Sequence, residues 1–205
     1  MSATRVTHLG SRGLRIEVDG VSEAIALADW LRRADVVRAE EVIPGARSVI
    51  LDGVTDPAAA VSALRTWGAS LAAGNDTQAG PLVEVPVTYD GTDLADVARR
   101  WDVSIPGVVE VMSRVELVSA FCGFAPGFAY LSGLPEHLAV PRLDTPRPRI
   151  PAGSVALADA WCGIYPTASP GGWRIIGRTS LTLWDDRADP PALLAPGTRV
   201  RLVAT

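Results

Sequence analysis

The sequence contains no lysine, and all 19 of its basic residues are arginine. This absence excludes a Schiff-base lysine, a P-loop lysine and a biotinylated lysine from the chain. Histidine and cysteine are also scarce, with two of each, so we expect neither a self-contained metal site nor a disulfide framework. The available chemistry therefore rests on arginine, carboxylates, hydroxyls and backbone groups, or on groups shared with a partner.

The charge and the hydrophobicity exclude two classes of partner. A formal net charge of −4 over 205 residues provides no basic field for nucleic acid. The chain is 48% hydrophobic, as soluble globular proteins are, but it lacks the run of about 18 apolar residues that a membrane span needs. Residues 1–11 lack the apolar stretch of a signal peptide, so we expect a cytoplasmic protein.

The hydrophobic periodicity predicts an α+β protein that begins with an α/β domain over residues 1–90. Residues 14–18, 36–43, 48–51 and 83–87 read as strands. Ser22 can cap one helix, and Asp56 can cap another that has Pro57 at its first position. The resulting order, β-α-β-β-α-β, is the ferredoxin-like arrangement.

A helical connection is predicted over residues 91–114. Leu94, Val97, Ala98 and Trp101 fall on one helical face, and Ser104 can cap a second short helix. The two helices either form a small binding unit or simply pack between domains.

Residues 115–205 are predicted to form a β-domain. Eight of the 16 prolines and seven of the 19 glycines lie between residues 121 and 172, which excludes long helices there. Short strands are expected at 154–158, 174–176, 180–184 and 199–203. Several short strands separated by turn signals indicate a β-barrel or sandwich.

Three segments of this domain are candidates for a binding site. The first, residues 121–131, interleaves glycines with Phe124, Phe128 and Tyr130. Aromatic rings in such a segment either wall a pocket for a small planar group or form an aromatic mini-core that holds the loop.

The other two segments carry arginines and glycines. In residues 141–154, alternating prolines stiffen a chain that presents Arg142, Arg147 and Arg149, either as an anion site or as a solvated arginine face. Residues 163–173 contain Gly171-Gly172, whose amides could form an anion-binding concavity with the Ser169 hydroxyl, or an ordinary turn.

His137 is the histidine nearest these loops in the sequence. It is the candidate general acid or base, although a histidine in such a position can also simply cap a turn.

Taken together, the motifs resemble a known family. Gly-Phe-Ala-Pro-Gly-Phe at 123–128, Pro-Ala-Gly-Ser at 151–154, Gly-Ile-Tyr-Pro at 163–166 and Ser-Pro-Gly-Gly-Trp at 169–173 are similar to those of the allophanate hydrolase subunit 1 family. The same family is also known as the 5-oxoprolinase B-type subunits, and it includes a KipI-type inhibitor of a sporulation histidine kinase. Departures at Ala129 and at residues 158–162 affect the expected shape of the pocket.

The resemblance implies a cyclophilin-like β-barrel at 115–205 and a shared active site. Family members work beside a sister subunit, of the allophanate hydrolase subunit 2 or 5-oxoprolinase C type, and a third subunit joins in the oxoprolinase. That complex consumes ATP and opens 5-oxoproline to glutamate. The alternative is a KipI-like regulatory module that docks on a sensor histidine kinase, whereas prolyl isomerase activity would rest on fold analogy alone.

The resemblance and the three segments together give a set of expected site residues. The complex would use ATP at a site that is not assigned to this chain. The chain itself would carry no metal and no covalent biotin. His137 is the catalytic candidate. The residues expected to bind a small amide substrate are Gly123, Phe124, Pro126, Gly127, Phe128, Arg147, Arg149, Gly153, Ser154, Tyr165, Ser169, Gly171, Gly172, Trp173 and Arg178.

Overall fold

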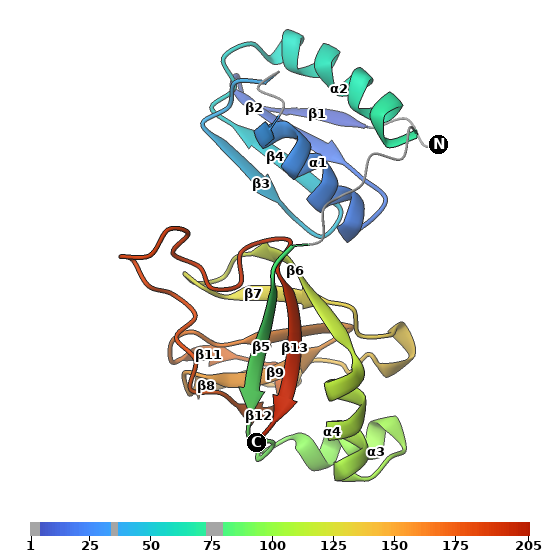
Figure 1. The fold of residues 1–205 in the computed structure, drawn as a ribbon, viewed down its shortest axis with the longest axis vertical. Helices are drawn as coiled ribbons and strands as arrows, with labels where there is room; N and C mark the ends of the chain where they lie inside the picture. Colours follow the sequence, from blue (N-terminus) through green and yellow to red (C-terminus); the bar gives the residue numbers. More distant parts are fainter. Residues whose placement is uncertain (1–4, 34–36, 73–79) are drawn as a thin grey trace. The chain divides into compact units, whose positions relative to one another are not determined.

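The computed structural model describes residues 5–33, 37–72 and 80–205. The chain divides into two compact units, residues 1–78 and 79–205 (Figure 1). Within the described ranges, no helix has the length and apolar character that crossing a membrane requires.

The first unit is a four-stranded antiparallel sheet with two helices. Its elements are β1 (Val6–Leu9), β2 (Gly13–Glu17), α1 (Val21–Arg33), β3 (Glu41–Pro44), β4 (Ser48–Asp52) and α2 (Pro57–Ala72), and the strand order is β1-β2-β4-β3. Leu14 and Ile16 alternate with the exposed Arg15 along β2, so one face of the strand is buried. Leu27 of α1 and Trp67 of α2 belong to the same core as these strand residues, so both helices pack on that face.

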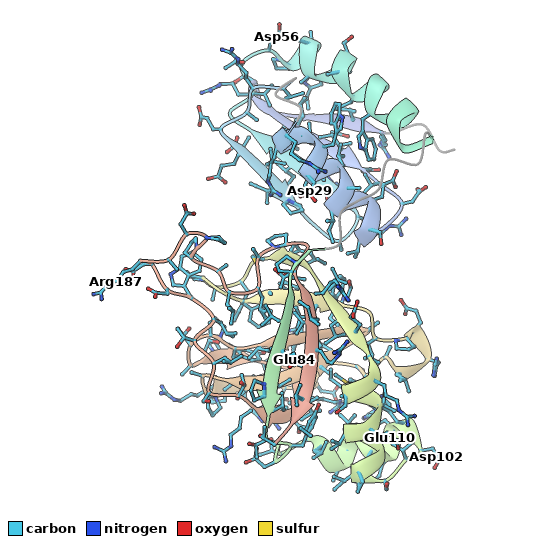
Figure 2. All side chains as sticks on the ribbon, in the orientation of Figure 1. Asp29, Asp56, Glu84, Asp102, Glu110 and Arg187 are labelled. Carbon is cyan, nitrogen blue, oxygen red and sulfur yellow. The ribbon has the colours of Figure 1, made fainter. Side chains whose placement is uncertain are left out.

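Local capping fixes the start of α2 as the sequence predicts. The backbone N–H of Ala59 donates to Oδ1 of Asp56 at 2.9 Å, and Pro57 occupies the first helical position. Figure 2 labels Asp56 at this helix end.

The ferredoxin-like order predicted for this unit is wrong in one strand. Residues 82–87 do form a strand, β5 (Leu82–Val87), but it pairs in parallel with β13 (Arg199–Ala204) in the second unit. The edge of the first sheet beside β2 is occupied by β1, a strand that the periodicity does not predict. The boundary between the compact units therefore lies at residues 78–79, ahead of β5, and not at residue 90.

The second unit is built around a seven-stranded sheet that is nearly closed into a barrel. The remaining elements are α3 (Leu94–Trp101), α4 (Ile105–Arg114), β6 (Glu116–Cys122), β7 (Ala129–Ser132), the 3₁₀ turn η1 (Glu136–Leu138), β8 (Arg147–Ile150), β9 (Ser154–Ala158), β10 (Trp161–Ile164), β11 (Ser169–Gly171) and β12 (Arg174–Arg178). The strand order is β12-β9-β10-β7-β6-β13-β5, and β8 pairs separately with β11. Thr88, just after β5, exchanges two backbone hydrogen bonds of 2.9 Å with Arg178 of β12, which joins the two edges of the sheet.

The two predicted helices belong to this second unit. Ser104 caps α4 by accepting a hydrogen bond of 3.2 Å from the Gly107 amide. The helix α3 packs against β12, and α4 packs against β13, so the pair contributes to the core of the barrel unit. Val97 of α3 and Met112 of α4 are fully buried there.

The strand predicted at 180–184 is absent. After β12, the chain from Thr179 to Thr198 is irregular, with a single bridge between Trp184 and Ala192. Leu183 and Leu194 are buried and fasten this segment to the core. Figure 2 labels Arg187 at the tip of the loop, pointing away from the sheet.

Candidate functional site

Residues 179–184, called the strap here, form one wall of a pocket in the second unit. The Thr179 amide donates to the Gly153 carbonyl at 2.9 Å, and the Leu183 carbonyl accepts from the Leu193 amide at 3.0 Å. Both ends of the strap are therefore held by neighbouring loops.

Two glycines with positive φ allow those loops to approach the strap closely. Gly153 has a φ of 79°, and a Cβ there would overlap the Thr179 carbonyl oxygen. Gly127 has a φ of 80°, and a Cβ there would lie 2.9 Å from Cβ of Trp184 and 3.0 Å from the Leu183 oxygen. Both positions require glycine for conformation and for space.

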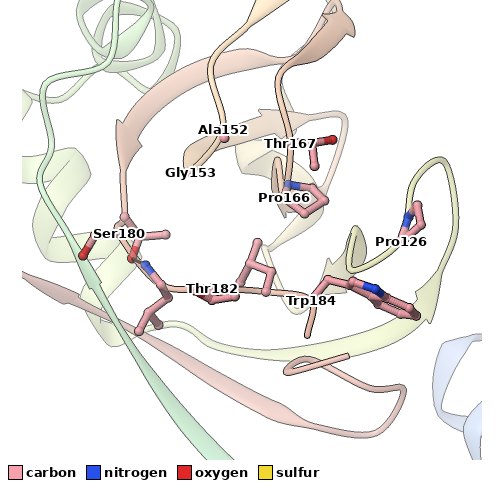
Figure 3. A pocket seen from close by; sticks show the side chains of 11 residues that line it. Pro126, Ala152, Gly153, Pro166, Thr167, Ser180, Thr182 and Trp184 are labelled. Atoms are coloured by element: carbon pink, nitrogen blue, oxygen red, sulfur yellow. Dashed lines mark hydrogen bonds between the residues drawn. The ribbon is translucent and has the colours of Figure 1, made fainter. Parts of the chain in front are cut away.

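The strap and the loops border an open pocket with a volume of about 530 Å³. Figure 3 shows Ser180, Thr182 and Trp184 along one wall, Ala152, Gly153, Pro166 and Thr167 opposite, and Pro126 beside Trp184. The complete lining is Pro126, Ala152, Gly153, Pro166, Thr167, Thr179, Ser180, Leu181, Thr182, Leu183 and Trp184. This volume lies in the range of small-molecule sites.

The lining combines apolar surface with hydroxyl groups and contains no ionisable side chain. Four hydroxyl groups come from Thr167, Thr179, Ser180 and Thr182, and the apolar lining residues include two prolines, two leucines and Trp184. Such a pocket can orient a neutral ligand by hydrogen bonds, whereas proton transfer at neutral pH needs a titratable group.

The predicted aromatic residues separate into a buried set and one exposed ring. Phe128, Tyr165 and Trp173 are buried in a common cluster, and the Phe128 ring lies 5.3 Å from Tyr165 and 5.5 Å from Trp173 in edge-to-face contacts. These three rings support the loops from beneath, as the mini-core alternative predicts. Burial raises the pKa of Tyr165, and the nearby Arg142 charge opposes that rise.

Phe124 lies at the exposed margin of this cluster. Its side chain is 60% exposed, and its backbone has a φ of 71°, a left-handed conformation that is uncommon for a bulky residue. Its ring touches the edge of Phe128 with centroids 5.3 Å apart. The loop thus presents one aromatic ring to solvent beside the pocket residue Pro126.

Arg147, Arg149 and Arg178 are the arginines expected to bind the substrate, and two of them are engaged in ion pairs. Arg147 contacts Asp93 at 2.8 Å, and Arg178 contacts Asp90 at 2.8 Å. The buried Arg174 likewise contacts Asp96 at 3.0 Å. The acids come from residues 90–96, outside the arginine-rich stretch, so these cations are neutralised by a segment distant in sequence.

Arg149 is the third of these arginines. Its side chain is exposed, and no ion pair within the described residues involves it. It therefore remains available to an anionic ligand.

The remaining predicted residues take several positions. Gly171 pairs with Arg147 in the ladder between β11 and β8, and the Gly172 carbonyl accepts a hydrogen bond of 2.8 Å from Leu143. Ser169 begins β11, and its hydroxyl donates to the Thr167 carbonyl at 3.4 Å.

Ser154 is buried at the start of β9, and Gly123 donates its amide to the Phe128 carbonyl. Of the predicted residues, Pro126 and Gly153 line the pocket.

His137 lies on the 3₁₀ turn and is exposed. The neighbouring Leu138 carbonyl accepts a hydrogen bond of 2.8 Å from Nε1 of Trp101, which docks the turn on α3. His137 is not among the residues that line the pocket. Both the catalytic role and the capping role of His137 stay predictions.

The strap is a site element that the sequence reasoning missed. The alternating pattern Ser180-Leu181-Thr182-Leu183-Trp184 predicts a strand, and the same pattern describes an extended wall with Leu183 buried and Thr182 exposed. The concentration of hydroxyl residues in Thr179-Ser180-Leu181-Thr182 is the one signal that could have found it.

Comparison with known proteins gives consistent matches across the chain. The family model "Carboxyltransferase domain, subdomain C and D" matches residues 4–194. The B subunit of the Escherichia coli O157:H7 5-oxoprolinase is 42% identical over 179 residues, which cover 84% of this chain and 81% of the relative.

Solved structures are also similar to this chain in both fold and sequence. The crystal structure of TTHA0988 has a TM-score of 0.76 and 35% identity over 95% of this chain, which spans only 40% of the TTHA0988 chain. A conserved uncharacterized protein from Pyrococcus horikoshii, PH0987, has a TM-score of 0.58 and 29% identity, with 98% of this chain and 97% of that one covered.

Proposed function

Because the chain belongs to the carboxyltransferase-domain family, subdomains C and D, we propose that it is the B-type subunit of a multi-subunit hydrolase that opens 5-oxoproline. The relative from Escherichia coli O157:H7 that supports this assignment is named for that role and matches 84% of the chain. The product of hydrolysing this cyclic amide is glutamate.

The character of the pocket is the observation that carries the proposal. The wall opposite the strap comes from the family motifs through Gly153 and Pro166, and the motif residue Pro126 lies beside Trp184. The pocket offers hydroxyl and backbone groups without an ionisable side chain. Hydrolysis of an amide needs a general acid or base and a stabiliser for the developing oxyanion. We therefore assign the pocket to substrate positioning and the proton-transfer groups to a second chain, in an active site that the two chains share.

Arg149 and the ATP-using step have further roles in the proposed complex. Arg149 is exposed, so it can meet the substrate carboxylate through charge-assisted hydrogen bonds. The proposed complex couples opening of the lactam to ATP consumption, and any P-loop lysine used in that step lies on another subunit because this chain contains no lysine.

Reconstitution tests the proposal. The chain is purified alone, with its sister subunit, and with the sister and third subunits, and glutamate release from 5-oxoproline is measured with and without ATP. We expect ATP-dependent release from the full combination and none from the chain alone. If no combination releases glutamate above background, the oxoprolinase assignment is wrong.

A further inference from the structure

The backbone of the strap carries unpaired hydrogen-bonding groups where it passes the pocket. Among the described residues, no backbone-to-backbone hydrogen bond involves Ser180, Leu181 or Thr182. The Leu181 amide donates to the Thr179 hydroxyl at 3.3 Å. Ser180 and Thr182 line the pocket and are exposed, and the N–H and C=O of each have no backbone partner among the described residues.

The burial pattern shows how these groups are arranged. Leu181 and Leu183 pack toward the core, whereas Ser180, Thr182 and Trp184 are exposed, which is the alternation of an extended chain. In an extended chain, the N–H and C=O of one residue face the same lateral side, and residues two apart share that side. Ser180 and Thr182 therefore form one edge with two donor–acceptor pairs.

A cyclic secondary amide is the small ligand that matches such a pair. Its ring holds the N–H and the C=O on the same edge, in the cis geometry, whereas an acyclic secondary amide is almost entirely trans. We propose that the strap backbone at Ser180 or Thr182 binds the cis amide of a lactam through two reciprocal hydrogen bonds. This inference rests on the proposed function and identifies the part of the substrate that this chain recognises.

The rest of the pocket suits the same ligand. Trp184 is 40% exposed beside Thr182 and offers an apolar face to the methylene groups of a ring. The lining is uncharged, as recognition of a neutral amide requires. The cavity of about 530 Å³ is larger than a five-membered lactam, which leaves space for catalytic groups from a second chain.

Binding to the full-length chain tests the inference without any turnover. The probes are 2-pyrrolidone, N-methyl-2-pyrrolidone, which lacks the N–H, and N-methylacetamide, which is trans. We expect 2-pyrrolidone to bind and to shift the amide NMR signals of residues 180–182, and the other two probes to bind at least about tenfold more weakly. Equal binding of the N-methylated lactam, or no binding of 2-pyrrolidone, would overturn the inference.

Proline substitutions test the same hydrogen bonds from the protein side. Ser180→Pro and Thr182→Pro each remove one free N–H, and Ser180→Ala and Thr182→Ala are the matched controls that keep it. We expect one proline variant to bind 2-pyrrolidone at least about tenfold more weakly than its matched alanine variant, which lacks the same hydroxyl but keeps the N–H. If both proline variants bind as the wild-type chain does, the strap backbone does not bind the amide.

The outcomes separate this inference from the proposed function. Lactam binding at the strap without glutamate release by any reconstituted complex would leave the site standing and contradict the function. Glutamate release that neither proline variant alters would leave the function standing and contradict the site.

Discussion

The carboxylate of Asp93 binds Arg147 through one oxygen and the backbone of β12 through the other. Oδ1 accepts from Arg147 at 2.8 Å, and Oδ2 accepts from the Ile175 amide at 2.8 Å. The Asp93 side chain is 9% exposed and the Arg147 side chain 30% exposed. An arginine that the sequence presents as a ligand-binding residue thus joins β8 to the start of α3 and to β12.

We therefore predict that Asp93→Ala destabilises the protein by about 3 kcal/mol, because it leaves the Arg147 charge and a buried amide without an acceptor. Asp90→Ala is the matched control: its ion pair with Arg178 is exposed, with side chains 46% and 68% accessible, and its loss costs less than about 1 kcal/mol. Urea unfolding of both variants provides the comparison. Equal destabilisation would contradict the structural role of Asp93.

Gly153 is predicted to tolerate no side chain. Gly153→Ala combines a φ of 79° with an overlap of the new Cβ and the Thr179 carbonyl, so the strap must move. Gly10 has a φ of 65°, but a Cβ added there would have nothing within 4 Å, so Gly10→Ala isolates the conformational cost of about 1 kcal/mol. We expect a clearly larger loss of unfolding free energy for Gly153→Ala, and similar losses in both variants would argue against close contact between loop and strap.

Alanine substitution is predicted to destabilise the protein at one of two phenylalanines that lie four residues apart, and to leave its stability nearly unchanged at the other. Phe128 is 2% exposed, so Phe128→Ala should cost about 3–5 kcal/mol of stability. Phe124 is 60% exposed, so Phe124→Ala should change stability by less than about 0.5 kcal/mol.

The function of Phe124 should appear in association instead. We expect Phe124→Ala to weaken binding of the sister subunit by about 2 kcal/mol, because an exposed aromatic ring is a typical interface anchor. Titration calorimetry with the purified sister subunit measures this affinity. An unchanged affinity would place Phe124 outside the interface.

Stability is predicted to fall in alkaline solution. Burial raises the pKa of the Cys162 thiol to about 12, whereas an unfolded cysteine ionises near a pKa of about 8.5. Between these values the unfolded chain has lost the proton that the folded chain retains, so unfolding becomes easier as the pH rises, by at most about 1.4 kcal/mol per pH unit. Below about pH 8 this contribution is fully retained.

The absence of lysine makes this effect measurable, because cysteine and tyrosine are then the side chains that titrate between about pH 8 and 11. Tyr89, whose pKa is also raised by burial, adds to the loss at the upper end of that range. We expect Cys162→Ala to flatten the dependence of unfolding free energy on pH between 8 and 10.5. An unchanged slope would show that the thiol does not drive it.

Features that depend on neighbours in sequence were predictable. The Asp56 and Ser104 caps act over three residues, and both are present as predicted. The alternation in β2 and β13 is likewise a local consequence of one buried face. Such patterns indicate whether a segment is a helix or a strand, and they predict most helices and several strands correctly.

Features that depend on distant partners were not predictable in the same way. Alternation identified β5 as a strand, but its pairing with β13, more than a hundred residues away, decides which sheet it joins. Counting charge near Arg147 and Arg178 could not reveal Asp93 and Asp90 as their partners. The strap was misassigned for the related reason that an extended segment becomes a strand only when another strand pairs with it.

Filling the pocket in the reconstituted complex tests its place in the shared active site most directly. Ala152 is exposed and lines the cavity, so Ala152→Trp places a ring in it, whereas Ala95→Trp adds the same ring to an exposed position of α3. We predict at least about a tenfold loss in kcat/KM for 5-oxoproline in Ala152→Trp, with unchanged subunit association, and wild-type activity in Ala95→Trp. Full activity of a folded and assembled Ala152→Trp complex would contradict the assignment of this pocket to the active site.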